Sequence, residues 1–177
     1  DVFIFFFVVE TKAELILRSR SLGQDVRLER DLLHPLVSGT DVSGYQKLDM
    51  RQFILFPYSL SIDAVELIPF QEISAKYPKI ADYLAANKSR LSSREKGRMR
   101  GAKWYGYIYL KNMRKQGFPK VCVPRLVDKL CAALDPDGVH YLDNVDVGGV
   151  TWKPDFAEHE LRYLLGLLNC GLLAWFF

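Results

Sequence analysis

The strongest constraint on this chain is a concentration of positive charge between residues 87 and 125. This segment holds twelve of the 24 basic residues and one acid, Glu95, so it carries about +11 whereas the rest carries about −8. The planar residues among these charges are Trp104, Tyr105, Tyr107 and Tyr109. Positive charge interleaved with planar side chains is typical of a surface that binds phosphates and bases. A solvated face above a few core aromatics has the same composition, so charge alone leaves both interpretations open.

The length and composition are those of an ordinary globular protein. A chain of 177 residues suits one domain, here residues 1–177, and can bury roughly 70% of its unfolded surface. Apolar residues make up 49% and charged residues 25%, and the net charge of +3 is too small to indicate a partner. The uneven distribution of charge is therefore the informative feature.

The cysteines argue against a disulfide framework and against structural zinc. Cys122, Cys131 and Cys170 are odd in number, lie in apolar contexts and show no C-x-x-C spacing. We expect buried free thiols in a reducing cytoplasm.

Neither end of the chain predicts a membrane segment. The apolar run that begins at Phe3 has no basic residues before it, as a signal peptide requires. The uncharged residues 163–177 would span about 22 Å as a helix, which is short of a bilayer core. The chain begins without Met and ends on an apolar run, so we expect a fragment of a longer protein.

Several short apolar runs predict strands. Residues 3–9 resemble a buried strand, residues 14–18 its partner, and residues 26–28 alternate as an edge strand does. Residues 53–58 predict a strand stopped by Pro57, which cannot donate to a ladder.

The second half of the chain mixes helices, strands and turns. Apolar residues from Tyr77 to Leu91 recur at helical spacing behind Pro78, and we end this helix near Gly97. A strand between two prolines follows at 120–123, and residues 135–138 fit a type I turn across which two strands pair. Gly148-Gly149 predicts another turn, and a helix runs from Glu160 to the end. The fold class expected is α+β, a mixed and largely antiparallel sheet with a few packed helices.

Seven motifs in order resemble a known family. They are DVF at 1–3, HPLVSGTDV at 34–42, FILFPY at 53–58, YPKIADYL at 77–84, KWYGY at 103–107, FPKV at 118–121 and LRYLLGLLNCGLL at 161–173. Their order resembles the TaqI-like C-terminal specificity domain, the target-recognition part of adenine-specific DNA methyltransferases and of restriction enzymes fused to them. The resemblance covers nearly the whole chain, with Cys170 where the family usually has serine.

The resemblance implies recognition and not chemistry. It implies sequence-specific binding of double-stranded DNA in the major groove, which presents a flipped target adenine to a methyltransferase domain on the N-terminal side of the same chain. That domain would hold S-adenosylmethionine and an Asn-Pro-Pro-Tyr type motif, and this chain has no such motif. We therefore expect no catalytic residues and no cofactor in this fragment, and a parent enzyme that methylates adenine, with or without a fused endonuclease.

The family supplies no general list of base-reading residues, so the candidates come from charge. The predicted DNA-binding residues are Arg90, Arg94, Lys96, Arg98, Arg100, Lys103, Tyr105, Lys111, Arg114, Lys115 and Lys120. Most would hold phosphates, and the candidates for base edges are Arg98, Arg100, Lys103, Tyr105 and Arg114. Trp104 is interpreted as a core anchor.

Other functions are weaker alternatives. Glu10-Thr11-Lys12 has the spacing of a nuclease motif, but the metal would need another acid upstream, where only Asp1 precedes it. A calcium loop at Asp135 would need glycine at its sixth position, where His140 stands. We expect no metal site. An interaction module with a solvated basic face and a domain that stacks single-stranded RNA on its aromatics remain alternatives.

Overall fold

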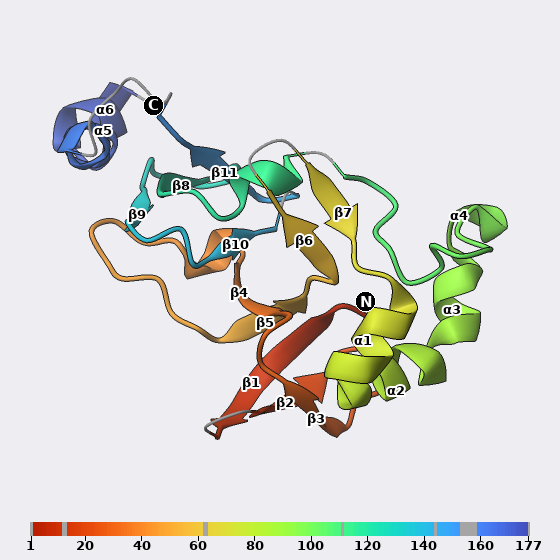
Figure 1. Ribbon diagram of the computed structural model, residues 1–177. Coiled ribbons are helices and arrows are strands. Elements are labelled where there is room, and N and C mark those ends of the chain that lie inside the picture. Colours follow the sequence, from red (N-terminus) through yellow and green to blue (C-terminus); the bar gives the residue numbers. More distant parts are fainter. Residues whose placement is uncertain are drawn as a thin grey trace. The chain divides into compact units, whose positions relative to one another are not determined.

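The computed structural model describes residues 2–11, 14–61, 64–110, 112–143, 145–152 and 159–176 (Figure 1). The chain forms two compact units, each built from two stretches. Unit 1 comprises Asp1–His34 and Gln52–Arg114, and unit 2 comprises Pro35–Arg51 and Lys115–Phe177. The mixture of helices with a mostly antiparallel sheet confirms the predicted α+β class. The prediction of a single domain stays a prediction.

The largest sheet has six strands in the order β10-β4-β5-β1-β2-β3. The strands are β1 Ile4–Glu10, β2 Glu14–Ser19, β3 Asp25–Glu29, β4 Leu33–Val37, β5 Gln52–Leu55 and β10 Tyr141–Leu142. β1 pairs antiparallel with β2 and β5, β2 pairs antiparallel with β3, and β10 pairs parallel with the last residues of β4.

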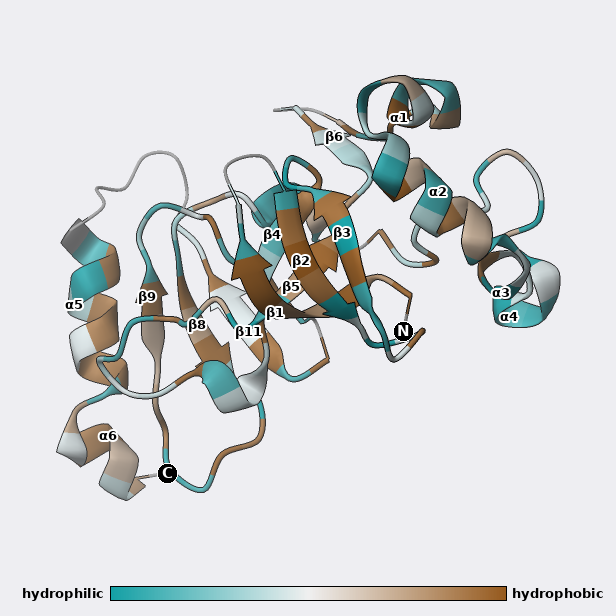
Figure 2. Cartoon of the chain, turned by 90° about the horizontal axis from the view of Figure 1, so that it is seen from below, coloured by the Kyte–Doolittle hydropathy of each residue, from teal (hydrophilic) through white to brown (hydrophobic). Residues whose placement is uncertain are grey.

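The apolar strand β1 is buried only at its beginning. Phe5 is fully buried, whereas Phe6, Phe7, Val8 and Val9 are 41–47% exposed, so the prediction of a strand was right and that of its burial was wrong. The pairing of β1 with β5 ends at Phe6, which lies opposite Gln52, so the residues of β1 after Phe6 extend beyond β5. The outer part of the hairpin is apolar in composition (Figure 2) yet extends past the strand that would cover one edge.

The sheet of unit 1 supports a group of short helices. These are α1 Phe70–Lys76, α2 Pro78–Ala86, α3 Lys88–Ser92 and α4 Arg94–Gly97. The Glu29 carboxylate of β3 accepts 2.9 Å hydrogen bonds from the backbone N–H groups of Lys79 and Ile80 at the start of α2. A carboxylate here satisfies two orphan donors and complements the helix dipole, which fixes α2 against β3.

The helix predicted from Tyr77 to near Gly97 is correct at its start and wrong in its continuity. It breaks at Asn87, whose backbone lies outside the helical region and whose side-chain amide donates to Tyr83 O at 2.9 Å. It breaks again at Ser93, and Glu95 and Lys96 then adopt left-handed conformations. The apolar face nevertheless continues, since Ile80, Leu84 and Leu91 all lie in the core of unit 1.

That core joins the inner face of the sheet to the helices. Phe5, Leu15 and Leu17 from β1 and β2 pack in one cluster with Ile73, Ile80 and Leu84 from α1 and α2. A second, two-stranded sheet pairs β6 Tyr58–Leu60 with β7 Val65–Leu67. The predicted strand at 53–58 is therefore two, because β5 ends before Pro57 as expected and β6 begins directly after it.

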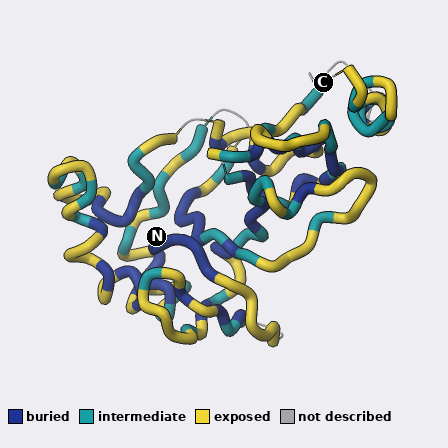
Figure 3. The backbone as a smooth tube through the Cα atoms, turned by 180° about the vertical axis from the view of Figure 1, so that it is seen from behind, coloured by how far each residue is buried: buried dark blue, intermediate teal, exposed yellow. Residues whose placement is uncertain are grey.

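Unit 2 is organised around a three-stranded antiparallel sheet. β8 Lys120–Pro124 lies between β11 Val147–Val150 and β9 Ala133–Asp135. The remaining elements are η1 Gly39–Asp41, η2 Met113–Lys115, which begins in unit 1, α5 His159–Leu168 and α6 Gly171–Phe176. The predicted C-terminal helix is thus interrupted between Leu168 and Gly171. Leu161 of α5 is buried, whereas α6 exposes Leu172, Trp175 and Phe176 (Figure 3).

Two predictions in unit 2 were wrong. No strands pair across residues 135–138, because β9 pairs with β8 and β10 pairs with β4. Gly148-Gly149 is not a turn but part of β11, opposite Val123 and Cys122. A Cβ on Gly149 would lie 2.7 Å from Leu142 Cδ1, so this glycine leaves room for a side chain of β10, which belongs to the other sheet. Among the described residues, no helix combines the length and hydropathy needed to cross a bilayer.

Candidate nucleic-acid interface

Arg94, one of the predicted DNA contacts, is used within the fold of unit 1. Its Nη2 donates to Trp104 O at 3.0 Å and Gly106 O at 2.7 Å, and its Nε donates to Leu91 O at 2.9 Å. The guanidinium also lies 5.2 Å from the ring centroid of Phe3. Burial lowers the pKa of Arg94, and among the residues that the structure describes no carboxylate pairs with its guanidinium. Arg94 holds the loop after α4 in place.

Tyr105 is also a core residue. It is buried, its hydroxyl donates to Ile68 O at 2.6 Å, and its ring packs 5.4 Å from that of Phe70. Trp104 is buried beside it, which confirms the interpretation of Trp104 as a core anchor. The aromatic motif therefore stabilises unit 1. Because Tyr105 is buried, its side chain is not accessible to a base.

Lys120 in unit 2 requires a correction. Lys120 and Asp135 are each 1% exposed, and Nζ lies 2.8 Å from Asp135 Oδ2. The same Nζ donates to Gln116 O at 2.8 Å and to Phe118 O at 3.1 Å. An ammonium has three donors, and all three are used, so Lys120 cannot hold a phosphate in this fold.

Five predicted residues come together as an exposed basic segment in unit 1, which we name the basic tip (residues 88–103). It comprises α3, α4 and the loop that follows, which lie beyond α2 in Figure 1. The predicted residues exposed there are Arg90, Lys96, Arg98, Arg100 and Lys103. Lys88, which the candidate list omitted, is exposed too, with its Nζ 5.4 Å from the Trp104 ring centroid. A cation that packs on a core indole has no sequence signal beyond its charge.

The cations of the basic tip differ from five other cations of unit 1. On and beside the sheet, Arg18, Arg27, Arg30, Lys76 and Lys79 each have a carboxylate partner. Within the described part of the chain, no ion pair involves a cation of the basic tip, and Arg90 donates instead to Ser21 O at 3.1 Å. The charge of these five cations is thus locally neutralised, whereas charge on the basic tip is available to an anionic partner.

The backbone of the basic tip is strained because two of its non-glycine residues adopt left-handed conformations. Glu95 and Lys96 have φ of 47° and 57°, the left-handed region that costs a non-glycine residue about 1–2 kcal/mol. Gly97 and Gly101 have φ of 87° and 104°. The Arg94 bonds hold this turn from within, and strain of this kind persists where the surroundings over-determine it.

The other candidates lie apart from the basic tip in sequence. Arg114 is exposed in η2 at the end of unit 1, and Lys115 is exposed at the start of unit 2. Lys111 is outside the described residues, as is Lys12 of the Glu-x-Lys motif, whose Glu10 pairs with Arg30. Among the residues with a described placement, no three His, Cys, Asp or Glu side chains are grouped to hold a metal ion.

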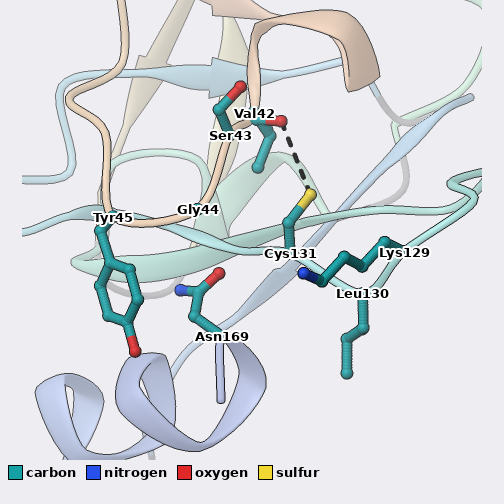
Figure 4. Close-up of a pocket in the computed structure, with 8 residues that line it drawn as sticks. All are labelled: Val42, Ser43, Gly44, Tyr45, Lys129, Leu130, Cys131 and Asn169. Carbon is teal, nitrogen blue, oxygen red and sulfur yellow. Dashed lines mark hydrogen bonds between the residues drawn. The ribbon is translucent and has the colours of Figure 1, made fainter. Parts of the chain in front are cut away.

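Unit 2 contains a pocket of about 350 Å³ that no sequence motif signalled (Figure 4). Its lining residues are Val42, Ser43, Gly44, Tyr45, Lys129, Leu130, Cys131 and Asn169. The Asn169 amide is bonded to the backbone of Ala132 and Leu165, and the Cys131 thiol lies 3.7 Å from Val42 O. Its polar side chains are thus largely used by the fold, and the lining specifies no ligand.

No protein-family model matches the sequence. The chain is similar to the type II restriction enzyme and methyltransferase RM.Eco57I of Escherichia coli, with 23% identity over 174 residues. The similarity covers 87% of this chain but only 16% of the E. coli protein. It supports the restriction–modification context inferred from the motifs. The finer assignment to a TaqI-like specificity domain stays a prediction.

Proposed function

We propose that this chain binds duplex DNA as the target-recognition part of a restriction–modification protein. The observation that carries the proposal is the basic tip, an exposed segment whose cations have no carboxylate partners among the described residues, whereas Arg18, Arg27, Arg30, Lys76 and Lys79 elsewhere in unit 1 are each paired. Phosphate contacts by such cations release counterions and supply sequence-independent affinity, and base contacts from the same segment supply specificity.

The proposal assigns recognition to this chain and chemistry to a separate domain. Adenine must leave the base stack before its amino group reaches a methyl donor. A methyltransferase domain on the N-terminal side of the same protein would hold the flipped adenine and S-adenosylmethionine. The name of the E. coli relative, which combines restriction and methylation, supports a parent enzyme of this kind.

Binding of single-stranded RNA receives less support from the side chains. Stacking on bases needs exposed rings, but Trp104 and Tyr105 are buried and Tyr107 is half-buried. Tyr107 also donates its hydroxyl hydrogen to Leu55 O, whereas Tyr109 is 71% exposed. One exposed ring among these four aromatics is a weak platform, so duplex DNA is the better ligand.

An interaction module is the second candidate, because two segments expose apolar side chains. Trp175 of α6 is 83% exposed, and Phe6 and Phe7 of β1 are about two-fifths exposed. A methyltransferase domain is the partner that the proposal expects. Docking and DNA binding are compatible, since the exposed apolar residues and the basic tip belong to different elements.

Fluorescence anisotropy with a random duplex between about 50 and 200 mM salt tests the proposal. Five or six phosphate contacts predict a log–log slope near −5, since each neutralised phosphate contributes about −0.9. Lys96→Gln with Arg98→Gln should make the slope about 2 less steep. Arg18→Gln with Arg27→Gln removes the same net charge from paired positions and should leave it nearly unchanged. Absent binding at 50 mM salt, or equal effects of the two double variants, would overturn the proposal.

A further inference from the structure

The side chain of Arg100 lies against the backbone of Gly97 within the basic tip. A Cβ on Gly97 would lie 2.7 Å from Arg100 Nε, 3.0 Å from Cζ and 3.3 Å from Cδ. The backbone N–H of Arg100 also donates to Gly97 O at 3.1 Å. The Arg100 side chain therefore occupies the space that a Cβ at position 97 would take.

Gly97 is needed for two separable reasons. Its φ of 87° lies in the left-handed region, which favours glycine. Its missing Cβ gives the Arg100 side chain its place. Gly101 shares the first property, with φ of 104°, but not the second, because nothing lies within 4 Å of a Cβ built on it. A comparison of alanine variants at the two glycines therefore distinguishes the effect of backbone conformation from the effect of the contact with Arg100.

A guanidinium whose directions are limited by packing is suited to recognising a base rather than only to neutralising charge. A long flexible cation loses rotamer freedom when it binds, and a pre-ordered one loses less. Phosphates tolerate many approach directions, whereas a bidentate bond to O6 and N7 of guanine requires the planar fork in one orientation. Arg100 suits that requirement, because its side chain is exposed, has no ion pair among the described residues and packs against Gly97 of its own turn.

We propose that Arg100 reads a guanine in the major groove and that Gly97 is its positioning residue. The inference rests on the proposed function, since it presupposes that the basic tip meets duplex DNA. The other exposed cations of the basic tip hold phosphates, and Arg100 distinguishes one base pair. Arg100→Lys keeps the charge but loses the fork, and it should therefore change specificity more than affinity.

The test is selection of bound duplexes from a randomised library, followed by titration of the selected site and of its single-base variants. The wild-type chain should prefer guanine at one position by about 5- to 150-fold. Arg100→Lys and Gly97→Ala should lose that preference and keep the salt slope within about one unit. Gly101→Ala, with comparable backbone strain, should retain the preference. Circular dichroism confirms that each variant is folded.

The outcomes separate the inference from the proposed function. A wild-type chain without salt-dependent duplex binding overturns both. Duplex binding without any guanine preference overturns the inference alone. The inference also fails if Arg100→Lys keeps the preference, or if it weakens binding to every sequence equally, which would make Arg100 a phosphate contact. Equal losses in Gly97→Ala and Gly101→Ala would remove the positioning role of Gly97.

Discussion

The Lys120–Asp135 pair provides the sharpest test of how unit 2 uses a basic residue. Lys120→Met keeps an unbranched apolar stem and removes the ammonium. Asp135 would then remain 1% exposed and lose a charged partner at 2.8 Å, while keeping hydrogen bonds from His140 N and Nδ1 at 3.1 Å. The carbonyls of Gln116 and Phe118 would lose their bonds to Nζ as well.

The expected cost follows from leaving a buried carboxylate without its cation. Removing one partner of a buried ion pair costs about 3–5 kcal/mol of unfolding free energy. We expect a value near the lower limit, about 3 kcal/mol, because His140 still donates two hydrogen bonds to Asp135. The double variant Lys120→Met with Asp135→Asn carries no buried charge at these positions. It should regain about half of the loss or more, since replacing both charges is often close to neutral.

Urea unfolding followed by circular dichroism measures these differences. Lys115→Met is the matched control, because Lys115 is an exposed lysine of the same unit and should change stability by less than about 0.5 kcal/mol. The salt slope of DNA binding should be the same in folded Lys120→Met and in the wild type. A Lys120→Met variant of unchanged stability with a flatter slope would refute the buried role and return Lys120 to the DNA contacts.

Three further predictions concern stability and reactivity. Tyr83→Phe should cost about 1–3 kcal/mol in urea unfolding, because the Tyr83 hydroxyl meets a buried backbone carbonyl and Ser19 Oγ, both at 2.8 Å; Tyr163→Phe, at a 70% exposed site, should cost almost nothing. Burial raises the pKa of Cys122 to about 12, so a thiol reagent at pH 8 should modify Cys122 only after unfolding, and rapid modification of the native protein would contradict the structure. Burial alone would raise the pKa of Asp135, but hydrogen bonds from His140 and Lys120 and the charge of Lys120 lower it below its unfolded value. Its stabilising contribution is therefore present above about pH 3.9 and lost as the pH falls through the folded pKa, so the stability gap between the wild type and Asp135→Asn should shrink between pH 6 and pH 3.

Short sequence patterns predicted the strands and helices whose formation depends on residues close together in the chain. The alternation of apolar residues indicated β3, and Pro78 in a first turn indicated the start of α2. The breaks at Asn87 and Ser93 could not be predicted in this way. The turn after Ser93 depends on Arg94, which bonds to carbonyl groups ten and twelve residues further along the chain. Helical periodicity contains no information about such a partner.

The candidate interface shows the same division. Charge density located the basic tip but did not distinguish its exposed cations from Lys120, whose carboxylate partner comes fifteen residues later on another strand. Alternation within β8 offered an unused signal, because Lys120 and Cys122 are two residues apart and so share one face of the strand. The Gly148-Gly149 pair was misinterpreted because a strand that a neighbouring side chain approaches closely and a turn favour the same residue type.

The bonds of Arg94 to Trp104 O and Gly106 O have a consequence for how this protein can diverge. These hydrogen bonds join Arg94, before the segment 95–103, to Trp104 and Gly106, after it, and so hold both ends of the segment at the core of unit 1. The chain between these two attachment points can change in sequence or length without disturbing the core. Doubling its length would add only about 0.6 kcal/mol to the entropic free energy of loop closure. Related proteins with unlike DNA targets would then share Arg94 and the buried aromatic motif and differ in the residues between them. If the segment between these two boundaries is exchanged between two related proteins, the recipient protein should acquire the DNA specificity of the donor protein.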